Sequence, residues 1–199
     1  MIYIYNTIKG NQYPIEIFLN FIRKKDIVYD PIRIEKYCHD GCRNYGKSGG
    51  CPPFASKFEK ILRGIEECAL ILGMFDSKYK PPKVQACTNR AIHWKFQDAV
   101  LANCMDKIGR HLQEKCGLNY LGTGYCMGCH GKKCAIKEGK PCRYPNKRTF
   151  SMEATGIDVV QTVQNIFQRR FFWYTKGNNN IPYLMKCILV YDDHVKEGL

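Results

Sequence analysis

The residues best able to do chemistry in this 199-residue chain are its twelve cysteines, seven of which are gathered in two short segments. The denser segment has the pattern C-x2-C-x4-C-x7-C and contributes Cys126, Cys129, Cys134 and Cys142. Glycine and proline recur around these cysteines and interrupt helices and strands, so we expect a loop over residues 124–150. Thiolates on one loop can converge on a point, and a metal centre is the simplest group to occupy it.

The other segment has the pattern C-x3-C-x8-C and contributes Cys38, Cys42 and Cys51. Glycines before Cys51 permit tight turns and two prolines after it stiffen the exit, so we expect a second cysteine-rich loop over residues 38–54. The spacing is not the C-x3-C-x2-C pattern of radical-generating enzymes that cleave S-adenosylmethionine. That chemistry is therefore not favoured.

Composition bounds the class of protein. A hydrophobic content of 45% is enough for a packed core, and the length favours a single domain over residues 1–199. The net charge is +13, which suits nucleic acid, an acidic protein partner or an anionic ligand. It also suits a four-iron cluster, which carries a charge of about −2 with its four thiolates.

The compartment decides how the cysteines are interpreted. The N-terminus lacks the charged start and long apolar run of a signal peptide, and no apolar run approaches the length of a membrane span. We therefore expect a cytoplasmic protein without a membrane partner. Clustered cysteines in that compartment indicate metal binding rather than disulfides.

The apolar patterning predicts alternating elements. Strands are expected over residues 2–8, 27–34, 68–75, 118–125 and 181–191. Helices are expected over residues 14–24, 56–67, 88–115 and from 151 onward, with residues 164–174 extending or following the last one. The expected fold class is α/β, a mixed sheet with flanking helices and two cysteine-rich metal-binding loops. Cys68, Cys104 and Cys187 are expected to be small buried hydrophobes.

Two sequence motifs together resemble a known family. They are Cys-x3-Cys…Tyr-Gly-Lys…Cys-Pro-Pro at 38–53 and Cys-x2-Cys…Cys…Pro-Cys-Arg-Tyr-Pro…Ser-Met-Glu-Ala-x-Gly-Ile-Asp-Val at 126–159. Over nearly the whole chain they resemble the domain of unknown function 2284 family, predicted metal-binding proteins of anaerobic archaea and bacteria. The resemblance implies iron–sulfur or other metal binding by these cysteines and supplies no reaction. The four-residue gap between Cys129 and Cys134 departs from the shorter gap expected, so Cys134 is the weakest match.

Iron–sulfur and zinc centres both accept four thiolates. Zinc sites usually show two C-x2-C knuckles, whereas this chain has one, between Cys126 and Cys129. Residues 126–150 also carry seven basic side chains against one acidic one, which suits an anionic cluster. Ligand spacing and the family's anaerobic hosts favour one or two [4Fe-4S] clusters, with zinc as the alternative.

The two cysteine groups supply seven ligands, one fewer than two four-iron clusters need. The 126–142 group completes one four-iron cluster, whereas Cys38, Cys42 and Cys51 are one ligand short. Cys87 is the first candidate for the eighth ligand because it precedes a helix among polar residues, and His39 and Asp40 are others. The alternatives are an iron left open to substrate, or one larger centre shared by all seven motif cysteines.

Three functions follow from these alternatives. The first is a two-cluster protein that exchanges electrons with an acidic redox partner. The second is an enzyme that uses an open cluster at Cys38, Cys42 and Cys51 in cofactor or tRNA modification. The third is a zinc-binding, nucleic-acid-binding module, which the positive charge allows but which is not favoured.

Overall fold

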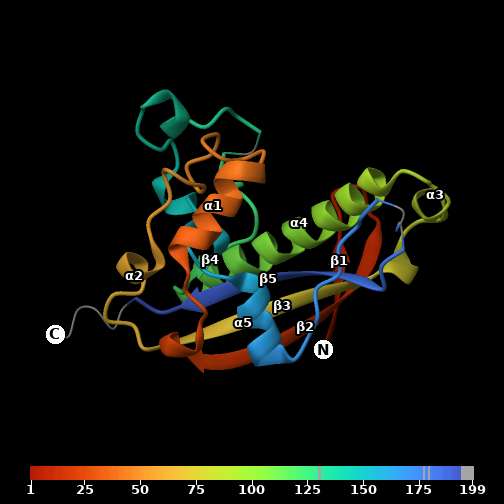
Figure 1. Ribbon diagram of the computed structural model, residues 1–199, viewed down its shortest axis with the longest axis horizontal. Coiled ribbons are helices and arrows are strands. Elements are labelled where there is room, and N and C mark those ends of the chain that lie inside the picture. Colours follow the sequence, from red (N-terminus) through yellow and green to blue (C-terminus); the bar gives the residue numbers. More distant parts are fainter. Residues whose placement is uncertain (130, 177, 179, 194–199) are drawn as a thin grey trace.

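The computed structural model describes residues 1–129, 131–176, 178 and 180–193, and its centre is a five-stranded, curled sheet (Figure 1). The strands are β1 (Ile2–Asn6), β2 (Gln12–Arg23), β3 (Glu67–Asp76), β4 (Asn119–Leu121) and β5 (Tyr183–Tyr191). Their order across the sheet is β1-β2-β3-β5-β4, and all of these pairings are antiparallel. The predicted mixed sheet is therefore wrong in strand direction, although the combination of a sheet with flanking helices is confirmed.

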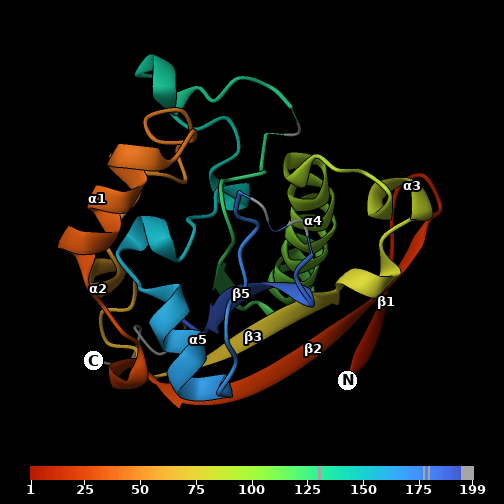
Figure 2. The ribbon, with the colours of Figure 1, turned by 45° about the vertical axis from the view of Figure 1, so that its right-hand side comes forward.

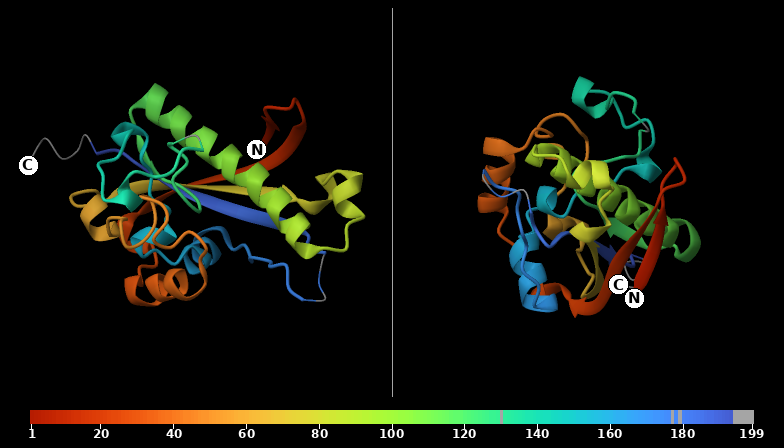
Figure 3. Two further views of the ribbon diagram at one scale, coloured as in Figure 1. Left: turned by 90° about the horizontal axis from the view of Figure 1, so that it is seen from above. Right: turned by 90° about the vertical axis from the view of Figure 1, so that its right-hand side faces the viewer.

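Helices cover both faces of the sheet, as Figure 2 shows. They are α1 (Pro31–Gly41), α2 (Phe58–Ile61), α3 (Pro82–Gln85), α4 (Arg90–Cys116) and α5 (Val159–Phe167). The long helix α4 crosses one face diagonally (Figure 3), and α1, α2 and α5 lie over the other. Across the described residues, no helix combines the length and the apolar character that a membrane span requires.

Alternation along the central strands explains why both faces are covered. In β3, Leu70 and Leu72 pack toward α2 and α5, whereas Ile71 and Phe75 pack toward α4. A strand buried on both sides reads as a continuous apolar run rather than an alternating one. The three cysteines expected to be buried, Cys68, Cys104 and Cys187, are confirmed in these two cores.

Two predicted elements near the N-terminus are wrong. Residues 14–24, expected as a helix, are most of β2, whose apolar side chains face both cores and so imitate helical spacing. Residues 27–34, expected as a strand, contain the start of α1. Asp30 caps that helix by accepting a hydrogen bond from the Arg33 amide at 3.1 Å, and Pro31 takes the first helical position, which it favours.

The other predicted elements are confirmed at their centres but differ at their ends. The strands at 2–8, 68–75 and 181–191 and the helix at 88–115 are present, whereas the helix at 56–67 shrinks to α2 and the strand at 118–125 to β4. The helix expected from residue 151 is a short 3₁₀ turn, η5 (Glu153–Thr155), followed by α5. Gly156 separates them with a φ of +98°, and α5 stops before the aromatic run at 171–174.

Gly109 is expected to be required where α4 crosses the sheet. A Cβ at this position would lie 2.8 Å from Cγ of the buried Tyr120 ring, so Gly109→Ala should lower the free energy of unfolding by about 1–3 kcal/mol. Alanine would otherwise stabilise a helix by roughly 1 kcal/mol over glycine. Urea unfolding monitored by circular dichroism measures the change. The control is Gly41→Ala in α1, where a Cβ meets nothing within 4 Å, and equal stability of Gly109→Ala and wild type would contradict this account.

Candidate metal centres

The C-terminal end of α1 carries the first two cysteines of the 38–51 group. Cys38 lies in the last turn of α1, and Cys42 follows the helix as its C-cap with an extended backbone; the Cys42 amide donates to the Cys38 carbonyl at 3.2 Å. Cys38 therefore lies on a helix and not in the expected loop. The loop begins after it and brings back Cys51, whose thiol donates to the carbonyl of Gly124 at 3.7 Å.

These three thiols are close enough to influence one another. The pKa of Cys51 is raised to about 12, mainly by burial and to a smaller extent by negative charge on Cys42 and Cys38. Burial likewise raises the pKa of Cys38 to about 11, with Cys42 as the next cause. Cys38 and Cys51 therefore favour the protonated form at neutral pH unless a cation binds.

The 126–142 group surrounds one cavity of about 520 Å³. All four of its cysteines line that cavity, together with Lys132, Lys133 and Arg148. Among its described residues, 122–129 and 131–152, the segment between β4 and η5 is irregular apart from two 3₁₀ turns, as its glycines and prolines predict. The structure therefore gathers Cys126, Cys129, Cys134 and Cys142 in a basic pocket.

Backbone amides point at two of these sulfurs. The Gly49 amide donates to Cys134 Sγ at 3.2 Å, and the Thr149 amide donates to Cys126 Sγ at 3.5 Å. Burial raises the pKa of Cys134, but amide donors from Gly49, Lys137 and Ile136 outweigh it and the net pKa is lowered. The site therefore stabilises a thiolate at Cys134, the residue that fits the family pattern least well.

The pKa of Cys129 is raised, in contrast to that of Cys134. Burial raises its pKa, and the neighbouring Cys126, Cys134 and Cys142 raise it further as thiolates, with Arg143 opposing them. Mutual repulsion among four thiolates is the cost of gathering them without a cation. A bound metal would remove that cost.

The two cysteine-rich segments are packed against each other, as their adjacent paths in Figure 1 indicate. Arg148 donates to the Gly49 carbonyl from Nε at 3.1 Å and from Nη2 at 2.8 Å, and Nη2 also donates to the Phe54 carbonyl at 2.8 Å. A Cβ on Gly50 would lie 2.7 Å from Cys126 Cβ, so only glycine permits this approach. The two groups therefore form one bipartite site.

A family model described as predicted metal-binding protein (DUF2284) matches residues 20–190, a span that contains both cysteine groups. The chain belongs to this family. No curated protein and no solved structure matches it. The family assignment confirms the resemblance drawn from the two motifs and supports metal binding without specifying the metal.

The donors that the chain offers are free thiols. All twelve cysteines are free, so none is consumed in a disulfide. Yet no three His, Cys, Asp or Glu side chains of the described residues converge tightly enough for a single metal ion.

None of the candidates for an eighth ligand lines the cavity that Cys38 and Cys42 share. Cys87 precedes α4 in a separate cavity with Lys80 and His93, and that cavity shares no lining residue with those of the two groups. Figure 1 shows the adjoining α3 far from α1. His39 Nδ1 lies 2.9 Å from an Asp40 oxygen, and Asp40 also pairs with Lys36 at 2.7 Å on the exposed side of α1. Ligation by Cys87, His39 or Asp40 stays a prediction without geometric support.

Glu153 lies beside the 38–51 group and was missed as a site residue. It is in η5, and it lines a cavity of about 650 Å³ with Cys38, Cys42 and Thr123. Glu153 falls in the helix expected from residue 151 onward, so its carboxylate was not among the candidate ligands. The signal that could have identified it is its place inside the Ser-Met-Glu-Ala segment of the family motif.

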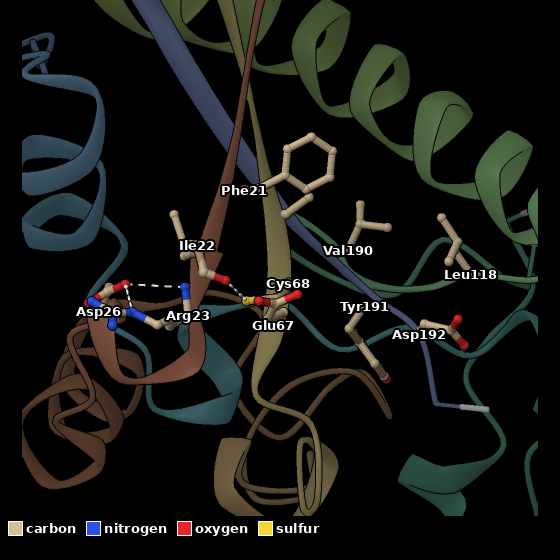
Figure 4. Close-up of a pocket in the computed structure, with 11 residues that line it drawn as sticks. Phe21, Ile22, Arg23, Asp26, Glu67, Cys68, Leu118, Val190, Tyr191 and Asp192 are labelled. Carbon is tan, nitrogen blue, oxygen red and sulfur yellow. Dashed lines mark hydrogen bonds and ion pairs between the residues drawn. The ribbon is translucent and has the colours of Figure 1, made fainter. Parts of the chain in front are cut away.

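One further cavity, of about 460 Å³, lies at the end of the sheet and contains none of the motif cysteines (Figure 4). Cys68 contributes to its wall and donates to the Ile22 carbonyl at 3.9 Å, as a buried thiol without a chemical role would. Arg23 and Asp26, which pair at 3.5 Å, lie at its rim. Nothing in this cavity resembles the cysteine sites.

Arg148 is expected to hold the bipartite site together. Arg148→Gln removes charged hydrogen bonds to Gly49 and Phe54, which should lower the free energy of unfolding by about 1.5–3 kcal/mol and reduce the metal retained by both groups. Denaturant unfolding and metal analysis after gel filtration measure the two effects. The control is Arg63→Gln, an exposed arginine before β3. Retention of metal and stability equal to that control would contradict the role of Arg148.

Proposed function

We propose that this protein binds two [4Fe-4S] clusters and exchanges electrons with a partner enzyme. One cluster is held by Cys126, Cys129, Cys134 and Cys142, and the other by the 38–51 group. The observation that carries the proposal is the gathering of four thiols around one basic cavity, with an amide donor on Cys134. Family membership supports the metal, and the donor set supports iron and sulfide.

The chain's own residues would tune such a centre. A bound cluster supplies one-electron chemistry. The amides of Gly49 and Thr149 would stabilise the added negative charge of the reduced form through Cys134 and Cys126. Lys132 and Lys133 at the cavity would act in the same direction by their charge. We expect these groups to raise the reduction potential.

The proposed partner is an acidic redox protein. Its docking surface would be the basic loop of the second group, formed by Lys132, Lys133, Lys137, Lys140, Arg143, Lys147 and Arg148. All but Arg148 are exposed, and Glu138 is the one acidic residue among them. We place the protein in the cytoplasm, a compartment in which twelve free thiols persist.

A second candidate function rests on the 650 Å³ cavity. Cys38 and Cys42 line it, so a metal centre there would border space large enough for a small substrate. An enzyme of cofactor or tRNA modification would use this arrangement. A substrate-dependent change in the spectrum of the 38–51 centre would favour this function, and no change across candidate substrates would remove its support.

Metal analysis of anaerobically purified protein tests the proposal. Wild type should contain about eight irons and eight sulfides per chain, and Cys126→Ala or Cys129→Ala should lose about four of each. Cys116→Ala, an exposed cysteine at the end of α4, is the control and should retain all of them. Stoichiometric zinc without sulfide would overturn the iron–sulfur assignment and favour the zinc-binding, nucleic-acid-binding alternative.

Docking on the basic loop predicts a salt-dependent reaction. Reduction by an acidic ferredoxin should slow as ionic strength rises, and Lys132→Glu with Lys133→Glu should slow it by roughly tenfold or more at low salt. Stopped-flow absorbance measures both effects. Lys9→Glu, an exposed lysine in the β1–β2 turn, is the control. A rate that depends neither on salt nor on the double substitution would place the docking surface elsewhere.

A further inference from the structure

The 38–51 group supplies three thiols, and the structure offers one neighbouring side chain that can complete it. The segment 151–158 is fixed against both parts of this group. The Ser151 amide donates to the Gly50 carbonyl at 3.3 Å, beside Cys51, and the Asp30 amide donates to the Gly156 carbonyl at 3.0 Å, at the start of α1. Glu153 is carried between these two attachments.

The start of α1 is held to this segment by a further ion pair. Arg33 Nη2 lies 2.6 Å from Asp158, and the Asp158 amide donates to the Val28 carbonyl at 2.9 Å. Gly156 packs so closely that a Cβ there would lie 2.9 Å from Pro31 Cα. These contacts hold the backbone of the 151–158 segment against the start of α1. They therefore fix where the backbone of Glu153 lies relative to Cys38.

Glu153 differs from the other carboxylates near this cavity. Glu35 pairs with Lys57, Asp98 with Lys186 at 2.9 Å, and Asp158 with Arg33. The Glu153 carboxylate has no hydrogen bond or ion pair to any residue that the structure describes. The Glu153 carboxylate is therefore available to a cation bound beside Cys38 and Cys42, with which it lines one cavity.

A second observation in the same wall points to a ligand. Thr123 Oγ1 is buried and has no hydrogen-bond partner. Among the described residues, it is the one buried side-chain nitrogen or oxygen atom without a partner. It lines the cavity with Glu153, Cys38 and Cys42. A buried hydroxyl without a partner is uncommon and often marks a bound ion or molecule.

We propose that Glu153 is the fourth protein ligand of the first metal centre, together with Cys38, Cys42 and Cys51. This rests on the proposed function only in requiring that the 38–51 group binds metal. A carboxylate oxygen is a harder ligand than a thiolate, so the metal atom that Glu153 binds differs from those bound by sulfur. That atom would be the one nearest the 650 Å³ cavity.

Mössbauer spectroscopy of ⁵⁷Fe-labelled protein, combined with metal analysis, tests this assignment. Wild type should show one iron of the first centre with an oxygen ligand. Glu153→Gln and Glu153→Ala should lose that signature and release one iron on mild ferricyanide oxidation, leaving a three-iron signal in electron paramagnetic resonance. The matched control is Glu35→Gln, which removes a carboxylate that also influences Cys38 but is paired with Lys57.

The outcomes separate this inference from the proposed function. If both Glu153 variants match wild type and Glu35→Gln in spectrum and metal content, Glu153 is not a ligand. If wild type contains zinc and no sulfide, the iron–sulfur proposal fails, and the same variants are then compared by zinc retained. Loss of one zinc in both Glu153 variants but not in Glu35→Gln would still support Glu153, and equal zinc would overturn it. Circular dichroism of each variant identifies any that fails to fold.

Discussion

The close approach of two backbone segments at Gly49 and Gly50 is the constraint on which both cysteine groups depend. Cys126 packs where a side chain on Gly50 would otherwise lie, and Arg148 fixes the Gly49 carbonyl from the opposite loop. The Gly49 amide is thereby aimed at Cys134. The contact between Arg148 and Gly49, about one hundred positions apart, thus affects both groups. It orients the amide that donates to Cys134, and it fixes the backbone that leads to Cys51.

The sheet provides the fixed points for this contact. The chain leaves β4 at Gly122 and returns beside it: the Gly122 amide donates to the Phe150 carbonyl at 2.8 Å, and the Met152 amide donates to the Gly122 carbonyl at 3.1 Å. The long cysteine-rich loop is therefore closed at its base, next to the packed core around Met152. Closing the base limits the conformations that the loop must lose when its thiolates gather.

The parts of this arrangement that sequence could predict are those encoded locally. The structure confirms the helix predicted at 88–115, which is α4, and the strand predicted at 68–75, which is β3. Each is encoded by apolar residues within a single segment. The helix predicted at 14–24 is wrong because β2 carries apolar side chains on both of its faces. Phe18 and Ile22 pack in one core and Ile15 in the other, so the spacing of these residues resembles that of a helix. Strand order, the approach of Gly50 to Cys126 and the place of Glu153 depend on contacts between distant segments, which no local pattern contains.

The two cysteine groups differ in ways that favour different tasks. The second group has amide donors, exposed cations and a thiol whose pKa is lowered, all of which stabilise negative charge close to solvent. The first has two thiols with raised pKa values, Cys38 and Cys51, together with an unpaired carboxylate and a large adjoining cavity. Electron exchange with a partner is best served by the exposed, basic centre. Chemistry on a bound molecule would be better served by the first centre, because its proposed carboxylate ligand, Glu153, lines the 650 Å³ cavity.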